Sequence, residues 1–143
     1  MKMCHLELKD SVWTRSGEIR IPWRFRLAGH TKSLGDWGEW VALKHLRKLG
    51  WDIVARNWRG RCGEVDLIAY DDPFLVFVEV KTRLLPTAIE PEEGVDLQKE
   101  RKLDEVALEF LLRHETPDTP IRLDVVGITT KDLRLFTLRH YIG

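Results

Sequence analysis

The chain has 143 residues, 43% of them hydrophobic and 32% charged, and its 23 Lys and Arg residues balance its 23 Asp and Glu residues. This length suffices for one core and is too short for two ordinary domains, and a net charge of zero excludes a bulk polycation that coats nucleic acid. Cys4 and Cys62 lie far apart without metal-ligand spacing, which indicates a reducing, cytoplasmic compartment, and no apolar run approaches the ~20 residues that cross a membrane.

Residues 1–30 form an N-terminal extension ahead of a single domain of residues 31–143. Apolar residues alternate along residues 19–27, which predicts a strand, and Pro22 favours an edge position. Four roles for the extension stay open: it extends the sheet, covers a hydrophobic face, contacts DNA, or is an upstream translation from an incorrectly chosen start.

Residues 33–49 predict a helix, with Ser33 as its N-cap and Gly50 just past its end. At about 100° per residue, Glu39 falls between Leu43 and Leu46 on the core-facing stripe. A carboxylate in that position is unusual. Either it forms a hydrogen bond or an ion pair with a following strand, or it belongs to an acidic site.

A strand is predicted at residues 51–58, and an acidic hairpin follows, with strands at residues 63–70 and 75–83. Strand alternation places Asp66 on the face of Glu64 and Ile68, and Glu79 on the face of Lys81. If Asp66 opposes Glu79, residues 71–74 form a four-residue loop that the acidic, Pro-containing sequence accepts. This register brings two carboxylates and one ammonium together.

Two carboxylates are oxygen ligands that suit Mg²⁺, which keeps several waters and binds substrate phosphate. A lysine on the same side of the strand would orient water or stabilise charge on the phosphate during in-line attack. The alternative is a ladder of cross-strand ion pairs, Glu64 with Lys81 and Asp66 with an arginine. Glu39 tips the balance towards the acidic site.

The rest of the chain supplies scaffold. Asp96 is expected to cap a helix that runs to about Arg113, a strand follows at residues 121–128, and an edge strand at residues 133–138. Asp124 lies in an apolar strand, and Arg122 on the same face would neutralise it as a structural pair. The order helix, three strands, helix, two strands predicts an α/β (mixed α+β) fold, with a mixed central sheet flanked by helices.

Five segments carry a resemblance to a known family: residues 35–39, 57–59, 63–69, 76–83 and 122–126. In this order they resemble the UPF0102 (YraN-like) family, which is similar to the PD-(D/E)xK nuclease superfamily and to archaeal Holliday junction resolvases. The resemblance implies a restriction-endonuclease-like core with Glu39, Asp66 and Glu79 as site acids, Lys81 as the catalytic lysine and the main-chain carbonyl of Val80 as a further metal ligand. The chain departs from the family pattern at Glu90, Glu92 and Glu93.

Two functions follow as hypotheses. The first is an endonuclease dependent on Mg²⁺ (or Mn²⁺) that hydrolyses structured DNA, with Asp66 and Glu79 as metal ligands. The second is a nucleic-acid-binding or assembly module that keeps the nuclease fold and does not cleave. Candidate contacts to nucleic acid are Arg59, Arg61, Arg83, Gln98 and Lys99. A homodimer is a further expectation, because two-fold proteins match two-fold substrates such as four-way junctions.

Overall fold

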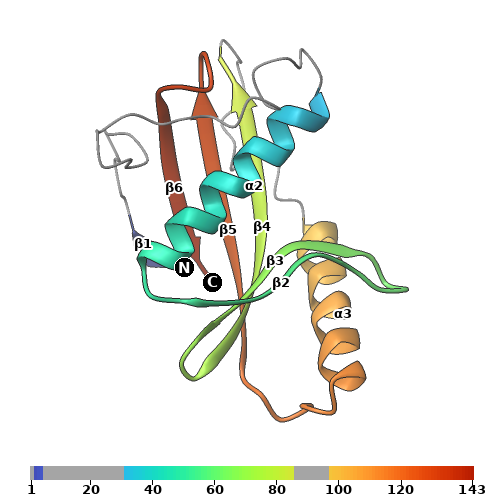
Figure 1. The fold of residues 1–143 in the computed structure, drawn as a ribbon. Coiled ribbons are helices and arrows are strands. Elements are labelled where there is room, and N and C mark those ends of the chain that lie inside the picture. Colours follow the sequence, from blue (N-terminus) through green and yellow to red (C-terminus); the bar gives the residue numbers. More distant parts are fainter. Residues whose placement is uncertain (1, 5–30, 86–96) are drawn as a thin grey trace.

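A mixed β-sheet with a helix on each face makes up the part of the chain that the computed structural model describes, residues 2–4, 31–85 and 97–143 (Figure 1). The strands are β1 (Lys2–Cys4), β2 (Asp52–Arg59), β3 (Glu64–Asp71), β4 (Phe74–Leu84), β5 (Ile121–Thr130) and β6 (Phe136–Ile142), and the helices are α2 (Thr31–Lys48) and α3 (Leu97–Arg113). The predicted α/β class is confirmed, and β1 precedes the predicted order of elements.

The strands lie side by side in the order β1-β6-β5-β4-β3-β2. β4 and β5 are parallel, whereas the other neighbouring pairs are antiparallel. A parallel pair needs a long crossover connection, and α3 lies within it. β4, which carries Glu79 and Lys81, therefore lies inside the sheet with a hydrogen-bonded strand on either side.

The two helices pack against opposite faces of the sheet, because side chains of β4 alternate between two apolar clusters. Val76, Val78 and Val80 pack with α2, and Leu75 and Phe77 pack with α3. The residues that the helices bring to these clusters are Trp37, Val41, Ala42, Leu43 and Leu46 from α2, and Leu103, Val106, Ala107, Phe110 and Leu111 from α3. The core-facing stripe predicted for the first helix is confirmed.

The N-terminal end of α2 differs from the prediction, and its C-terminal end agrees with it. Ser33 is not the N-cap, because the helix already begins at Thr31. At the other end Gly50 has a positive φ of 86°, its N–H donates to Arg47 O, and the N–H of Trp51 donates to Leu46 O. This pair of bonds closes the helix with a left-handed residue, which glycine adopts without steric cost.

The C-terminal strand was predicted in the wrong place. The edge strand expected at residues 133–138 is instead β6, which starts at Phe136 and lies between β5 and β1. The side chain of Asp132 accepts the N–H groups of Arg134 and Leu135, and Thr130 Oγ1 accepts the N–H of Leu133. These side-chain bonds hold residues 131–135 as a turn, so the strand begins later.

Lys2–Cys4 pairs with β6 and so extends the sheet, which is one of the roles considered for residues 1–30. The strand predicted at residues 19–27, the capping residue Asp96 and the acidic residues 90–93 lie outside the described residues.

A largely buried polar network links β3, β5, β6 and α2. We call its five members, Asp71, Arg122, Asp124, His140 and His45, the Asp124 network. Asp124 is completely buried. Arg122 donates to it through Nε (2.9 Å) and Nη2 (3.1 Å), and to Asp71 through Nη1 (2.9 Å). His140 Nε2 lies 2.8 Å from Asp124 Oδ2, and His45 Nε2 lies 3.1 Å from His140 Nδ1. The expected Arg122–Asp124 pair is present, within a larger network than predicted.

Candidate active site

The hairpin of β3 and β4 has the predicted register. Tyr70 opposes Leu75 and Leu67 opposes Val78, which are the partners expected if Asp66 is in register with Glu79. The expected four-residue loop is shorter, because Asp71 still pairs with Phe74. The chain therefore reverses within Asp72 and Pro73, which are joined by a cis peptide bond.

β3 is distorted at Asp66. Val65 packs in the cluster of α3 and Leu67 in the cluster of α2, although residues two apart on a regular strand share a face. Opposite this point, Asn57 of β2 has a positive φ of 48°. The regular alternation predicted for residues 64–68 is therefore broken at Asp66.

Because of this distortion, Asp66 bonds to the backbone of β4. The pairing of β3 with β4 stops at Leu67 and Val78, and the Oδ2 atom of Asp66 accepts the N–H of Val80 at 2.7 Å. The expected opposition of Glu64 and Lys81 does not occur: Glu64 instead pairs with Arg59 (3.1 Å) in solvent. The role of the Val80 carbonyl as a metal ligand stays a prediction.

Glu79 and Lys81 form a partly buried ion pair on one face of β4. Lys81 Nζ lies 2.9 Å from Glu79 Oε1, and the side chains are only 17% and 30% exposed, respectively. Val78 and Val80, between and beside them in sequence, point into the α2 cluster. Glu79 and Lys81 therefore share the opposite face, as the alternation predicted.

The pKa of Asp66 is shifted by interactions with the other three predicted side chains. Burial raises it most, the nearby carboxylates of Glu79 and Glu39 raise it further, and the Val80 N–H and Lys81 lower it, so that the pKa is raised to about 7. Glu39 is itself partly buried in the middle of α2. The fold thus brings acids from α2, β3 and β4, and one lysine, within electrostatic reach of one another.

The predicted nucleic-acid contacts are less closely grouped. Arg83 follows Lys81 on the same face of β4, and its buried Nε has no hydrogen-bond partner among the residues that the structure describes. Arg59 and Arg61 are exposed at the turn between β2 and β3. Gln98 and Lys99 lie in the first turn of α3, where the structure describes the backbone only.

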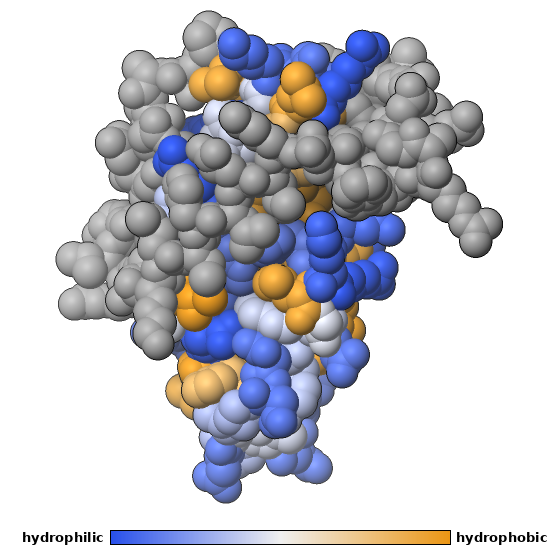
Figure 2. Space-filling model, turned by 90° about the vertical axis from the view of Figure 1, so that its left-hand side faces the viewer, coloured by the Kyte–Doolittle hydropathy of each residue, from blue (hydrophilic) through white to orange (hydrophobic). Residues whose placement is uncertain are grey.

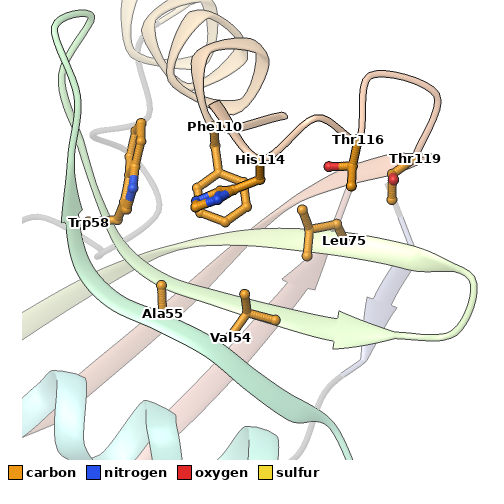
Figure 3. A pocket seen from close by; sticks show the side chains of 8 residues that line it. All are labelled: Val54, Ala55, Trp58, Leu75, Phe110, His114, Thr116 and Thr119. Atoms are coloured by element: carbon orange, nitrogen blue, oxygen red, sulfur yellow. The ribbon is translucent and has the colours of Figure 1, made fainter. Parts of the chain in front are cut away.

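A pocket of about 480 Å³ lies between β2, Leu75 and the C-terminal end of α3 (Figure 3). Trp58 forms one wall, where its ring meets Phe110 edge-on at 5.3 Å and lies 5.6 Å from the guanidinium of Arg113. These contacts show that Trp58 packs against α3. None of the predicted site acids lines this pocket.

The described surface is polar over the face seen in Figure 2, with apolar groups scattered among hydrophilic ones. Among the described residues, neither helix is long and apolar enough to cross a membrane.

Comparison with known proteins identifies the family. The model of "Uncharacterised protein family UPF0102" matches residues 38–128. The UPF0102 protein of Geotalea uraniireducens is 41% identical over 109 residues, which cover 76% of this chain and 86% of the relative. The chain belongs to the UPF0102 family. Other UPF0102 proteins are similar. That of Chloroflexus aurantiacus is 38% identical over 78% of this chain and 92% of its own length. That of Rhodococcus jostii is 44% identical over 69% of this chain and 84% of its own length.

The region shared with UPF0102 contains Glu39, Asp66, Glu79 and Lys81. Sequence reasoning did not identify two other sets of interacting side chains, which lie within this shared region or next to it. His45 and His140 showed no ligand spacing, because they meet only through the packing of α2 on β6. Glu109 is one of several acids in α3, and nothing in the sequence distinguishes it from the others. In the structure it binds the turn between β2 and β3.

Proposed function

We propose that this UPF0102 protein is a phosphodiester hydrolase that depends on Mg²⁺ or Mn²⁺ and acts on nucleic acid, with structured DNA as its substrate. The observation that carries the proposal is the gathering of Glu39, Asp66, Glu79 and Lys81 around the point where β3 leaves β4. Three of these groups come from different elements of the fold, so no single local pattern explains their meeting.

The donor set fits a hard divalent cation. Asp66 is held among carboxylates with a raised pKa, and Lys81, which lowers that pKa, is already engaged by Glu79. Such a site gains stability from further positive charge. Among the described residues, no three His, Cys, Asp or Glu side chains are gathered tightly enough to hold an ion. Asp66 and Glu79 would hold Mg²⁺, which proteins bind through one or two carboxylates.

Each side chain has a role in this proposal. Lys81, freed from Glu79 when that carboxylate holds a cation, would point its ammonium at the phosphate or at the attacking water. Glu39 would act as the third acid, directly or through a water. The bound ion would polarise the phosphate and make water more acidic. The Val80 carbonyl would be a further oxygen ligand.

Arg83 supports a phosphate-binding role for this face of β4. It lies two residues beyond Lys81, or roughly 6.6 Å along the strand. A buried guanidinium N–H without an acceptor is costly, and planar guanidinium groups match the oxygens of phosphate. Arg59, Arg61, Gln98 and Lys99 are the further candidate contacts, and phosphate contacts of this kind would make binding salt-dependent.

Cleavage assays test the proposal. Wild type, Lys81→Ala, Asp66→Asn and the control Lys48→Ala are incubated with junction, flap, single-stranded and duplex DNA in millimolar Mg²⁺ or Mn²⁺. We expect cleavage by wild type and Lys48→Ala, and a loss of about 10²- to 10³-fold in Lys81→Ala, as when one transition-state donor is removed. Cleavage that is equal in Lys81→Ala and wild type would reject this site.

A metal titration by calorimetry separates the two hypotheses. We expect binding in wild type and in Glu64→Gln, a control that removes an exposed carboxylate from the same strand, and none in Asp66→Asn. DNA binding without metal binding or cleavage would favour the alternative, a non-cleaving nucleic-acid-binding or assembly module on a nuclease fold.

A further inference from the structure

The turn between β2 and β3, residues 60–63, rests on α3 (Figure 1). The N–H of Gly60 donates to the carbonyl of Gly63 at 2.9 Å, which closes the turn. Arg59 directly precedes the turn and Arg61 lies within it, and both side chains are exposed. A two-stranded ribbon with a glycine turn is by itself a mobile element, so what holds the tip in place decides where these cations point.

Glu109 of α3 holds the tip. Its carboxylate accepts the N–H of Arg61 on Oε1 and the N–H of Cys62 on Oε2, each at 2.9 Å. These two backbone bonds are the main reason why the pKa of Glu109 is lowered. Arg113, one helical turn later, approaches Oε1 at 2.8 Å. The side chain of Glu109 is only 13% exposed, so the carboxylate is committed to the turn and not to solvent.

The fit between the turn and α3 is close. A Cβ atom at Gly60 would collide with the Glu109 carboxylate and with the Trp58 ring. Gly63 has a positive φ of 147°, and a Cβ there would lie 3.2 Å from Val106. A side chain at Gly60 would therefore have to displace the Glu109 carboxylate or the Trp58 ring.

The cations at the tip are free to bind an anion. Arg61 has no side-chain partner among the residues that the structure describes. Arg59 pairs with Glu64, but the two side chains are 79% and 66% exposed, and an ion pair in solvent adds little stability. The carboxylate of Glu109 is already bound to two backbone N–H groups and to Arg113.

We propose that the turn at residues 60–63 is a preorganised binding surface for the phosphate backbone of nucleic acid, and that Glu109 is its positioning residue. Glu109 touches no phosphate. It fixes the backbone from which Arg59 and Arg61 reach the phosphates, and so lowers the entropy that binding would otherwise cost. The inference rests on the nucleic-acid binding proposed above, and it names the surface that does the binding.

The test depends on whether DNA affinity rises or falls when Glu109 is removed, because simple electrostatics and the proposal predict opposite changes. Removing an acid near a polyanion should strengthen binding, and Glu105, exposed one turn earlier on α3, is the matched control. Affinity for a fluorescein-labelled four-way DNA junction and a labelled duplex is measured without divalent metal over about 50 to 200 mM salt. We expect Glu105→Ala to bind as tightly as wild type or more tightly, and Glu109→Ala to bind more weakly.

The salt dependence identifies the lost contacts. If Glu109→Ala releases both arginines, the slope of log affinity against log salt falls by about 1 to 2, since each phosphate contact contributes about 0.9. In an Arg59→Gln/Arg61→Gln background, Glu109→Ala should no longer weaken binding. All variants are measured well below their thermal unfolding midpoints, and Glu109→Gln, which keeps one acceptor oxygen, should bind with intermediate affinity.

Two results would overturn the inference: Glu109→Ala binding as tightly as Glu105→Ala, or weakening that persists in the background without the two arginines. Binding of the DNA probes by a wild-type protein that cleaves nothing would reject the hydrolase and leave this surface standing. A wild-type protein that binds neither probe would reject both.

Discussion

At the scale of single residues, Asp66 is an unusual acid among the residues that the structure describes. Its carboxyl is partly buried beside Glu79 and within electrostatic reach of Glu39, and its pKa is raised to about 7. An acid with a raised pKa is more easily protonated in the folded protein than in the unfolded chain. The folded state without metal therefore holds a proton there that the unfolded chain has released above its usual pKa of 3.8.

The contribution of Asp66 to the free energy of unfolding therefore falls as pH rises between about 4 and 7, because the unfolded state binds fewer protons in that range. In EDTA at pH 8, we expect Asp66→Asn to be more stable than wild type by about 1 to 3 kcal/mol, allowing for solvent screening. At pH 4 to 5 the advantage should shrink, since both side chains are then neutral and the amide oxygen still accepts the Val80 N–H.

Urea unfolding at pH 5 and pH 8 measures the difference, with Glu64→Gln as the exposed control that should show none of it. An Asp66→Asn protein that gains no stability at high pH would mean that the carboxyl is not held near neutrality. The same substitution is expected to abolish cleavage, so a gain in stability and a loss of activity would come from one group.

At the scale of elements, the contact of α2 with β4 sets the position of Glu39. A Cβ atom at Gly38 would overlap the side chain of Thr82, so the helix lies as close to the strand as glycine allows. Gly35, one turn earlier in the same helix, has nothing within 4 Å of such an atom. The two glycines therefore make a matched pair.

We expect Gly38→Ala to destabilise the protein by about 1 to 3 kcal/mol through overpacking, and Gly35→Ala to stabilise it by up to about 1 kcal/mol, because alanine is the better helix former. Thermal or urea unfolding measures both. Thr82→Ala should relieve part of the cost of Gly38→Ala, with a coupling energy of about 0.5 kcal/mol or more. Equal effects of the two glycine substitutions would contradict the close approach.

At the scale of the whole molecule, the Asp124 network ties together segments that are distant in the chain. Arg122 also lies 4.9 Å from the ring of Trp51, and the N–H of Gly143 donates to Asp124 Oδ1 at 3.2 Å. Asp124 accepts from His140 Nε2 when it is ionised, and the contact of His45 Nε2 with His140 Nδ1 needs one donor and one acceptor. Protonation of both rings would break this contact, because an imidazolium has no acceptor nitrogen.

Protonation of His45 in acid should therefore weaken the Asp124 network, an effect opposite in sign to that of Asp66. Burial and the neighbouring His140 lower the pKa of His45 from 6.5 to about 4. A histidine with a lowered pKa stabilises the fold fully above pH 6.5, and this contribution is lost as pH falls from 6.5 to 4, because the unfolded chain then binds the extra proton. The loss is at most about 3 kcal/mol at about 1.4 kcal/mol per pKa unit.

Urea unfolding of wild type and His45→Gln at pH 7, 5.5 and 4.5 tests this. The amide of glutamine can still donate to His140 without titrating, so we expect the variant to lose less stability in acid. Identical acid dependence in the two proteins would show that His45 does not carry the effect.

Much of the fold follows from local patterns in the sequence. The two-residue alternation of β4 and the short turn after β3 predicted the hairpin register, because a slip by one residue would expose the apolar side chains. The stripe on residues 33–49 and Gly50 predicted α2 and its end, and the same stripe singled out Glu39. These inferences needed only neighbours in the chain.

Other features depend on which elements meet. The start of β6 depends on side-chain bonds within residues 131–135, and its last residues pair with β1 at the far end of the chain. The break in alternation at Asp66 occurs opposite the positive φ of Asn57 on the neighbouring strand. Neither has a signature in local periodicity.

The sequence by itself determined the fold class, the elements from α2 to β5, the hairpin register and four candidate site residues, because period and turn chemistry act over a few residues. Only the tertiary structure decided that Asp66 binds the backbone of β4, that His45 meets His140, and that Glu109 holds the turn at residues 60–63. Each of these contacts joins groups 14 to 95 residues apart, and such partners are chosen by packing of the whole chain rather than by any segment of it.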